Sequence, residues 1–211
     1  MIKIENTDVY GWEAAIRGAR NPMNSWGMSD SLISEEWRNG VPILHSIKLG
    51  PNDLRLLRNL ANAGPDHGKF LRFITVSLDI AAPLYWWKEF DTYKVGTVAN
   101  SCSTMHKIHA KEFTLEDFSC EWCPGFTNGV VSTLETWRKL YLETGDKKYW
   151  YAIIQLLPTS YNQRRTVLLN YQVLKSMYHA RKHHKLDEWR EFCRFIESLP
   201  YSELITGGSG E

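Results

Sequence analysis

The fold is decided by residues 73–108, which read FITVSLDIAAPLYWWKEFDTYKVGTVANSCSTMHKI. At the start of this stretch, apolar residues alternate with polar ones at Ile74, Val76, Leu78 and Ile80. That period of two predicts a strand with one buried face. Pro83 then suits the start of a helix, where no backbone donor is needed. The small polar residues from Gly96 to Thr104 are typical of a loop that delivers functional side chains.

Composition limits the classes of protein that the chain fits. Its 211 residues carry a formal net charge of +1, which disfavours nucleic-acid binding by bulk charge. No apolar run reaches about 18 residues, so we expect no membrane span. We find no secretion signal, and the four cysteines then indicate reduced thiols in the cytoplasm. Nine tryptophans and ten tyrosines indicate extensive aromatic packing, a planar ligand or an oligomer interface.

Toward the N-terminus, we expect a short strand at residues 2–4 and a helix that breaks at Asn21-Pro22. The polar segment 22–30 is a candidate loop over a pocket. Leu32, Ile33 and Trp37 have helical spacing and predict a short helix ended by Gly40. A further helix is expected to begin at Pro51 and to end at Gly64.

The C-terminal half reads as mostly helical. Residues 111–129 are expected to form a loop, and Ser132 and Glu135 have capping-box spacing before a helix that Gly145 ends. Further helices are expected over 146–157, 163–183 and 187–199, of which the second is long and amphipathic. The chain is therefore predicted to be α+β, a single domain over 1–205 with a mixed sheet flanked by helices. Residues 206–211 are predicted to be a flexible tail.

The predicted helix over 163–183 places Asn170 and Arg181 on one face. They are eleven residues apart, which is about three turns, or roughly 16 Å along the axis. The arginine fork at one end suits a phosphate or carboxylate ligand. The alternative is structural, with Asn170 capping a buried contact and Arg181 paired with an acid such as Glu188.

Three other groups of residues invite a functional interpretation. The loop that holds Lys94, Thr97, Asn100, Ser101, Ser103 and Thr104 is rich in donors, and either cradles a phosphate or is only a turn-rich connector. Cys120 and Cys123 follow His106 and His109 and resemble half of a zinc site, but no second Cys-x-x-Cys exists, so we expect no metal. The histidines at 179, 183 and 184 lie among basic residues, as in a solvated helix end.

In three blocks the chain resembles a divergent flavin-dependent thymidylate synthase. His67 lies six residues before Phe73, where the family has a second His, and a strand and an aromatic helix follow. The family's Arg-His-Arg signature falls on Thr92-Tyr93-Lys94, so that one cation is kept, and Thr97 keeps a hydroxyl. The third block is Pro158, Asn170, Arg181 and Trp189 at spacings similar to the family's. The resemblance covers roughly residues 54–199.

This resemblance implies a homotetramer whose shared sites bind a nucleotide, FAD, methylenetetrahydrofolate and a nicotinamide reductant. The implied reaction is reductive methylation of deoxyuridine monophosphate. The alternative is a homologue that binds or sequesters a nucleotide without catalysis and has lost the flavin site. Arg181 would be catalytic, and the implied substrate contacts are Glu89, Ser103, Asn170 and Arg181. The implied cofactor contacts are His67, Lys94, Thr97, Asn100 and Ser101.

Overall fold

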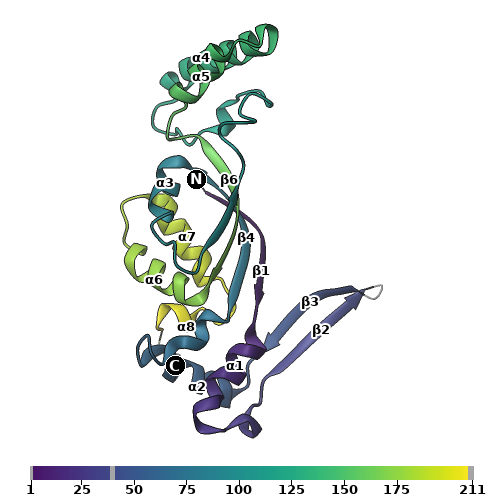
Figure 1. The fold of residues 1–211 in the computed structure, drawn as a ribbon. Coiled ribbons are helices and arrows are strands. Elements are labelled where there is room, and N and C mark those ends of the chain that lie inside the picture. The colour runs from purple at the N-terminus through teal and green to yellow at the C-terminus, as the bar shows by residue number, and fades with distance from the viewer. Residues whose placement is uncertain (1, 39–40, 209–211) are drawn as a thin grey trace. The chain divides into compact units, whose positions relative to one another are not determined.

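The computed structural model describes residues 2–38 and 41–208, without the side chains of 35–46, 124 and 126. Within this part of the chain, four strands form one sheet in the order β1-β4-β6-β5 (Figure 1). They are β1 (Lys3–Tyr10), β4 (Thr75–Pro83), β6 (Asn162–Asn170) and β5 (Val98–Ser101). The alternation predicted for β4 is confirmed, because Val76, Leu78 and Ile80 are buried while the residues between them are half-exposed. The prediction of an α+β fold is therefore confirmed.

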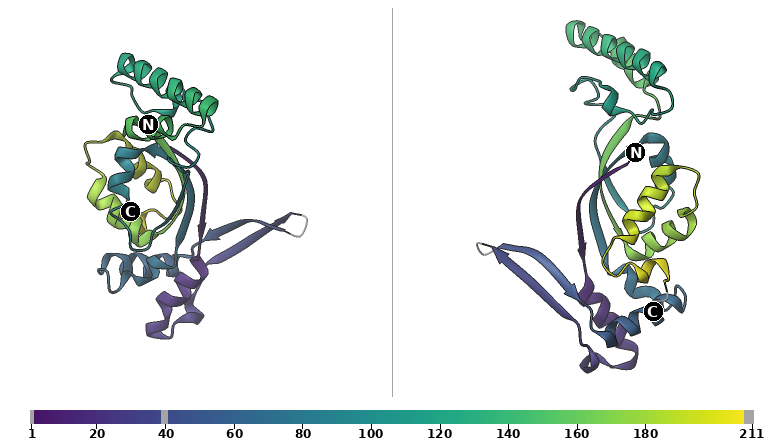
Figure 2. Two further views of the ribbon diagram at one scale, coloured as in Figure 1. Left: turned by 45° about the horizontal axis from the view of Figure 1, so that its top comes forward. Right: turned by 180° about the vertical axis from the view of Figure 1, so that it is seen from behind.

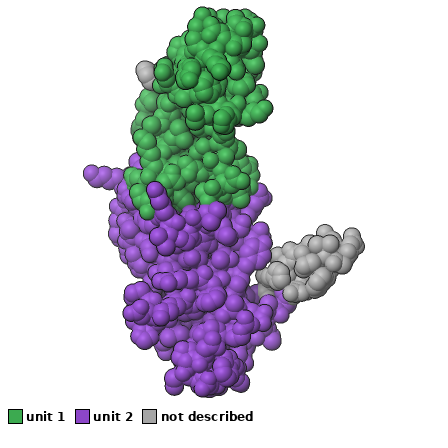
Figure 3. Space-filling view, in the orientation of Figure 1, with its two compact units in different colours: residues 1–5, 79–92, 99–166 green, residues 6–78, 93–98, 167–211 purple. Residues whose placement is uncertain are grey.

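The chain forms two compact units, which Figure 3 colours separately. Unit 1 comprises residues 1–5, 79–92 and 99–166, and unit 2 comprises residues 6–78, 93–98 and 167–211. Each of the four sheet strands has residues in both units. The predicted domain 1–205 and tail 206–211 stay predictions; Thr206 ends a helix, and 209–211 lie outside the described residues.

Unit 1 contains α3 (Leu84–Phe90), α4 (Pro124–Thr144) and α5 (Lys147–Leu156). Its core cluster brings α4 and α5 together through Leu134 and Ile153, with Phe113 and Phe118 from the preceding segment. Trp87 on α3 is buried, and its ring nitrogen donates to the Gln163 carbonyl of β6 at 2.9 Å. This bond satisfies the one polar atom of a large buried ring.

Unit 2 contains α1 (Trp12–Arg20), α2 (Pro51–Asn62), α6 (Tyr171–Arg181), α7 (Asp187–Glu197) and α8 (Glu203–Thr206). Figure 2 shows α6, α7 and α8 beside one another from two further directions. Trp12 and Tyr171 meet edge to face with ring centroids 5.5 Å apart, which joins α1 to α6 in the core. No helix among the described residues has both the length and the apolar character to cross a membrane.

The helix predicted around Leu32, Ile33 and Trp37 is wrong. The segment is instead β2 (Leu32–Arg38), which pairs antiparallel with β3 (Val41–Lys48). Pairing with β3 satisfies the backbone groups of β2 that face it, and this outweighs the helical spacing of the three apolar residues. Gly40, which was expected to end the helix, lies outside the described residues.

Further boundaries differ from the prediction. The loop over 96–104 contains the edge strand β5, whose four residues are all exposed. Helix α4 begins at Pro124, so Ser132 lies inside it, and no described side chain caps α4; the capping box of Thr114 and Asp117 belongs to a separate 3-10 turn, Leu115–Asp117. Proline at the first helical position needs no donor, and this allows the earlier start.

The predicted long helix over 163–183 is wrong in its first half. Residues Asn162–Asn170 form β6, in which Gln163, Val167 and Leu169 are buried and the intervening Arg164, Thr166 and Leu168 are exposed. This period of two matches a sheet with one covered face, and pairing with β4 and β5 outweighs the local helical spacing. Helix α6 begins only at Tyr171.

A buried ion pair fixes the segment between α1 and α2. Asp53 is fully buried, and Arg20 Nε donates to its Oδ1 at 2.6 Å. The other carboxylate oxygen accepts from the hydroxyls of Ser29 and Ser31 and from the amides of residues 30 and 31. Asp30 in turn accepts from the amides of Asn52 and Asp53 and so caps α2. The cap residue Gly50 must be glycine, because a Cβ there would lie 2.2 Å from Asp30 Cγ.

We predict that Asp53→Asn lowers the free energy of unfolding by about 3–5 kcal/mol, because Arg20 would remain buried without its counter-charge. Urea unfolding measures this loss. The matched control is Glu13→Gln, which breaks the exposed Arg17–Glu13 pair and should cost no more than about 0.5 kcal/mol. Equal losses in the two variants would contradict the prediction.

The same carboxylate predicts a pH dependence. Burial acts to raise the pKa of Asp53, but hydrogen bonds from Ser31, Ser29 and Arg20 outweigh burial and lower it. A carboxyl whose folded-state pKa is depressed stabilises the fold above its unfolded pKa of about 3.9. This contribution is lost as the pH falls through the folded-state pKa. As the pH falls below about 4, the free energy of unfolding of the wild type should therefore decrease more than that of Asp53→Asn. Parallel curves of unfolding free energy against pH for the two proteins would contradict this.

Candidate functional site

Helix α6 begins directly at the end of β6, and Asn170 is the residue at which the strand becomes a helix. Its backbone is extended, and its side-chain oxygen accepts from the Val173 amide at 3.0 Å, as an N-cap does. The Tyr171 amide donates to the carbonyl of Ile74 at 3.0 Å, just before β4. Asn170 therefore precedes α6, and the prediction that it lies inside a helix with Arg181 is wrong; its side chain caps the helix, and its role in binding a ligand stays a prediction.

The loop after α3 approaches this cap closely. Gly96 has φ +80°, and a Cβ there would lie 3.0 Å from Asn170 Nδ2 and 3.1 Å from Val173 Cγ2. Glycine meets both requirements, since it adopts positive φ without cost and has no side chain. The loop segment 93–98 is thus held against the first turn of α6.

Arg181, the last residue of α6, contacts the same loop. Its Nε donates to the Tyr93 hydroxyl at 3.0 Å, and its guanidinium carbon lies 4.9 Å from the ring centroid of Trp189 on α7. Trp189 is fully buried, so the half-buried cation is stacked on a desolvated ring. The structure therefore brings Arg181 together with Tyr93 at one end of α6, and Asn170 with Gly96 at the other.

The residues assigned by the resemblance are divided between the units. Unit 2 holds His67, Lys94, Thr97, Asn170 and Arg181, and unit 1 holds Glu89, Asn100, Ser101 and Ser103. His67, Lys94, Asn100 and Ser101 are exposed, and Glu89 is half-buried on α3. Their roles in a site stay predictions.

Two of the predicted hydroxyls differ in what they contact. Ser103 Oγ accepts from the amides of Met105 and His106, at 3.1 and 2.9 Å, and so closes a turn. Thr97 Oγ is buried, and among the described residues it has no hydrogen-bond partner. A buried hydroxyl without a protein partner suits a bound water or ligand atom.

The segment that replaces the flavin signature offers little charge for FAD. Thr92 Oγ donates to the Glu89 carbonyl at 2.7 Å, and Tyr93 is engaged by Arg181, which leaves Lys94 as the exposed cation. A doubly charged pyrophosphate needs several charge-assisted donors once water is removed. The residues present therefore do not fit FAD at this segment.

A polar pocket, here called the Lys175 pocket, lies on the other side of α6. Its volume is about 450 Å³. It is bordered by the end of α2 and the following turn, by α6 and by the end of α8. It is lined by Ala61, Asn62, Gly64, Pro65, Gln172, Lys175, Ser176, His179, Thr206 and Gly207.

The charge in this pocket comes from Lys175. Its Nζ donates to the Ala61 carbonyl at 2.7 Å, near the C-terminal end of α2, and burial lowers its pKa. His179 lies one turn further along α6, and none of the lining residues is a carboxylate. A half-buried ammonium among amides, two hydroxyls and an imidazole, without an acid, is suited to an anion.

Sequence reasoning missed this pocket, although a signal for it was present. Residues 172, 175, 176 and 179 are all polar and recur at the spacing of one helix face. The predicted helix over 163–183 favours the stripe that carries Arg181 instead, and the sequence pattern predicts for His179 only a solvated basic helix end.

The cysteine motif shows no metal-binding geometry. Cys120 Sγ donates to Ser160 Oγ at 3.1 Å, and Cys123 precedes α4, with its thiol 3.9 Å from Thr127 Oγ. Among the side chains that the structure describes, which exclude those of 35–46, 124 and 126, no group of three or more acidic, histidine or cysteine residues is placed to hold a metal ion.

Comparison with known proteins shows the fold. Two flavin-dependent thymidylate synthase structures from Helicobacter pylori, both with FAD and dUMP, superpose with a TM-score of 0.74 at 16% and 15% identity. The first match covers 97% of this chain and 98% of the other. The UMP/dUMP methylase PolB from Streptomyces cacaoi, bound with 5-Br dUMP, superposes with a TM-score of 0.65 at 13% identity, covering 98% and 94%. The sequence matches no protein-family model, and no curated protein matches it.

We predict that Arg181→Ala lowers the free energy of unfolding by about 1–3 kcal/mol. The variant loses both the contact with the Trp189 ring and the hydrogen bond to Tyr93. Thermal or urea unfolding measures the loss, with Lys185→Ala as the control at an exposed cation nearby. Unchanged stability would show that Arg181 does not hold the loop to α6.

Proposed function

We propose that this protein, which has the fold of the flavin-dependent thymidylate synthases, binds a pyrimidine nucleoside monophosphate in the Lys175 pocket. The observation that carries the proposal is a concave, polar, acid-free pocket with a half-buried ammonium. Solved structures of this fold contain dUMP or its bromo analogue, which supports a nucleotide as the anion.

The phosphate is the group that Lys175 recognises. One N–H of the ammonium donates to the Ala61 carbonyl, and an ammonium has three such donors. The amides of Asn62 and Gln172 and the imidazole of His179 supply further donors around it. An arriving phosphate also favours the charged form of Lys175, whose pKa burial has lowered.

Residues implied by the resemblance remain candidates for other contacts. If the protein instead carries out the second candidate function, reductive methylation of dUMP, we propose Glu89, Ser103, Asn170 and Arg181 as its substrate contacts, with Arg181 as the catalytic residue. His67, Lys94, Thr97, Asn100 and Ser101 are the corresponding cofactor candidates. The pocket proposal does not depend on them, since Asn170 and Arg181 already have the partners described above.

The assembly is proposed from the resemblance, and the location from the cysteine content of the sequence. We propose a homotetramer in the cytoplasm. Light scattering measures the oligomeric state, and a monomer at working concentration would contradict the proposed tetramer.

We predict that deoxyuridine monophosphate raises the melting temperature, since a ligand selective for the folded state stabilises it. Lys175→Met should weaken binding by about tenfold or more, measured by calorimetry, because it removes a charge-assisted bond to the phosphate. His179→Ala should weaken it less, and Lys185→Met on the exposed surface should leave it unchanged. Deoxyuridine, which lacks the phosphate, should not distinguish Lys175→Met from the wild type.

An equal affinity of wild type and Lys175→Met for the monophosphate would contradict this site. The variant must be shown to be folded, because Lys175 also bonds to α2; a cooperative melting transition without ligand provides that check. If Lys175→Met is unfolded, Gln172→Leu tests the same wall of the pocket, and unchanged affinity in that variant counts against the proposal.

We also predict that the purified protein is colourless and releases no flavin on denaturation. The reason is the shortage of cations in the segment that replaces the flavin signature. The second candidate function is reductive methylation of dUMP, which is favoured by the fold match to FAD-containing structures. A visible flavin spectrum, together with methyl transfer to dUMP, would establish that function.

A further inference from the structure

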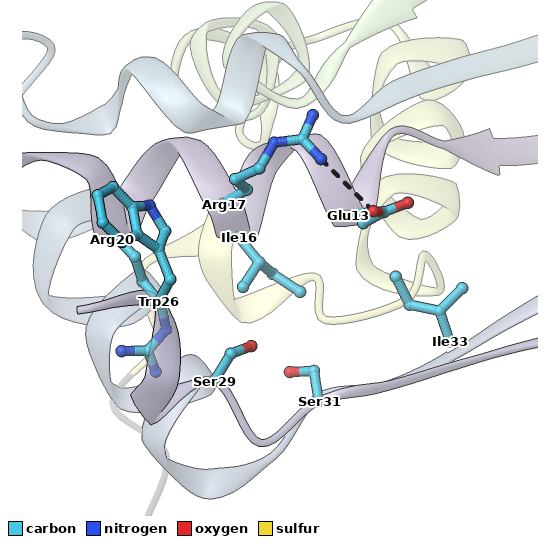
Figure 4. A pocket seen from close by; sticks show the side chains of 8 residues that line it. All are labelled: Glu13, Ile16, Arg17, Arg20, Trp26, Ser29, Ser31 and Ile33. Atoms are coloured by element: carbon cyan, nitrogen blue, oxygen red, sulfur yellow. Dashed lines mark hydrogen bonds and ion pairs between the residues drawn. The ribbon is translucent and has the colours of Figure 1, made fainter. Parts of the chain in front are cut away.

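A second pocket, here called the Trp26 pocket, lies between α1, the segment 21–31 and the start of β2 (Figure 4). Its volume is about 290 Å³. One wall is the face of α1 that carries residues 13, 16, 17 and 20 at helical spacing. The lining comprises Glu13, Ile16, Arg17, Arg20, Trp26, Ser29, Ser31 and Ile33.

The polar groups at the base of the pocket are already used. Arg20 donates from Nε to Asp53, from Nη1 to the carbonyl and hydroxyl oxygens of Ser25, and from Nη2 to the Met28 carbonyl. Arg20 Nη2 also pairs with Asp53 Oδ1 at 2.6 Å. These contacts account for the full donor capacity of a guanidinium.

The two serines and the indole are engaged in the same way. Ser29 and Ser31 donate their hydroxyls to Asp53 Oδ2, and Trp26 Nε1 donates to Asn21 Oδ1 at 2.8 Å. A sugar or another ligand that needs many hydrogen bonds would find these donors occupied. What the interior offers is apolar surface from Ile16, Ile33 and the indole ring, which is 51% exposed.

The pocket is built on a fixed base. Because the Arg20–Asp53 pair is buried and hydrogen-bonded on every side, the segment that carries Trp26 is held in place before any ligand arrives. A preformed site avoids the entropy cost of ordering its walls on binding. An exposed indole on such a base presents a flat surface for stacking against an aromatic ring.

The rim supplies one cation that can change partner. Arg17 pairs with Glu13 at 3.4 Å, and the two side chains are 63% and 78% exposed. Exposed pairs at this spacing contribute little to stability, so Arg17 can turn to a ligand at small cost. A carboxylate would meet its fork with two parallel hydrogen bonds.

We infer that the Trp26 pocket binds a small aromatic carboxylate, with its ring against Trp26, Ile16 and Ile33 and its carboxylate on Arg17. The size is right for one fused ring system, since the volume lies at the small end of ligand pockets. The pocket shares no residue with the Lys175 pocket, so this inference does not depend on the proposed nucleotide site.

The test uses 1-naphthoate and its neutral isostere 1-naphthamide, titrated by NMR into the full chain labelled with ¹⁵N. The Trp26 indole N–H signal, assigned by its loss in Trp26→Phe, should shift saturably.

Naphthoate should bind at least about fivefold more tightly than naphthamide, and Arg17→Gln should remove most of that difference. Trp26→Ala should weaken naphthoate by about fivefold or more, as followed by the ligand's own signals. The side chain is exposed, so folding should survive this change.

Matched control variants distinguish binding at this pocket from nonspecific binding to exposed arginine and tryptophan side chains. Arg55→Gln removes another exposed arginine and Trp122→Ala removes a tryptophan that is 95% exposed; neither should change naphthoate affinity. Equal affinity for naphthoate and naphthamide, unchanged affinity in Trp26→Ala, or no saturable binding would each overturn the inference. Displacement of naphthoate by deoxyuridine monophosphate would also overturn it, because it would place the probe in the nucleotide site.

Discussion

The hydrogen bond from the Val173 amide to the Asn170 side chain is the contact on which the arrangement of unit 2 depends. It turns β6 into α6 without a connecting loop, so the strand's place in the sheet fixes where the helix starts. Residues 173, 177 and 181 then face one way, and residues 172, 175, 176 and 179 face nearly the opposite way. One short cap therefore sets both the packing face, with Arg181, and the pocket face, with Lys175.

The two pockets of unit 2 differ in how many of their hydrogen-bond donors are already engaged by protein groups. In the Trp26 pocket, the hydrogen-bond donors of Arg20 and Ser29 at the base are bonded within the buried network around Asp53. The ligand-accessible surface is therefore an apolar interior with the Arg17 cation at the rim. In the Lys175 pocket, a half-buried ammonium makes one hydrogen bond to a helix end and lies among neutral polar groups. The first arrangement favours an aromatic ring, and the second favours a phosphate.

Sequence patterns predicted the elements whose periodicity matches their burial. The alternation of β4, the amphipathic helices α1, α2 and α7, and the α+β class all follow from local spacing. The resemblance in the blocks around His67, Thr92 and Asn170 identified the right fold, which solved structures confirm at 16% identity.

The secondary-structure predictions were wrong where strand pairing, rather than local spacing, determines the local structure. Residues Asn162–Asn170 and Leu32–Arg38 have spacings compatible with a helix, and pairing makes them extended: the first with the distant strands β4 and β5, and the second with β3, the next strand along the chain. The wrong helix over 163–183 placed Asn170 and Arg181 on one helix face. For this reason the polar face of α6 that carries Lys175 was not predicted as a site. The Arg20–Asp53 pair was also missed, since nothing local links residues 33 positions apart.

A crystal structure of the protein with deoxyuridine monophosphate would test the central claim most directly. The account predicts the phosphate within hydrogen-bonding distance of Lys175 Nζ, with Asn170 still bonded to the Val173 amide at the start of α6. A phosphate bound instead at Lys94 or Arg181, with no ligand density beside Lys175, would contradict it.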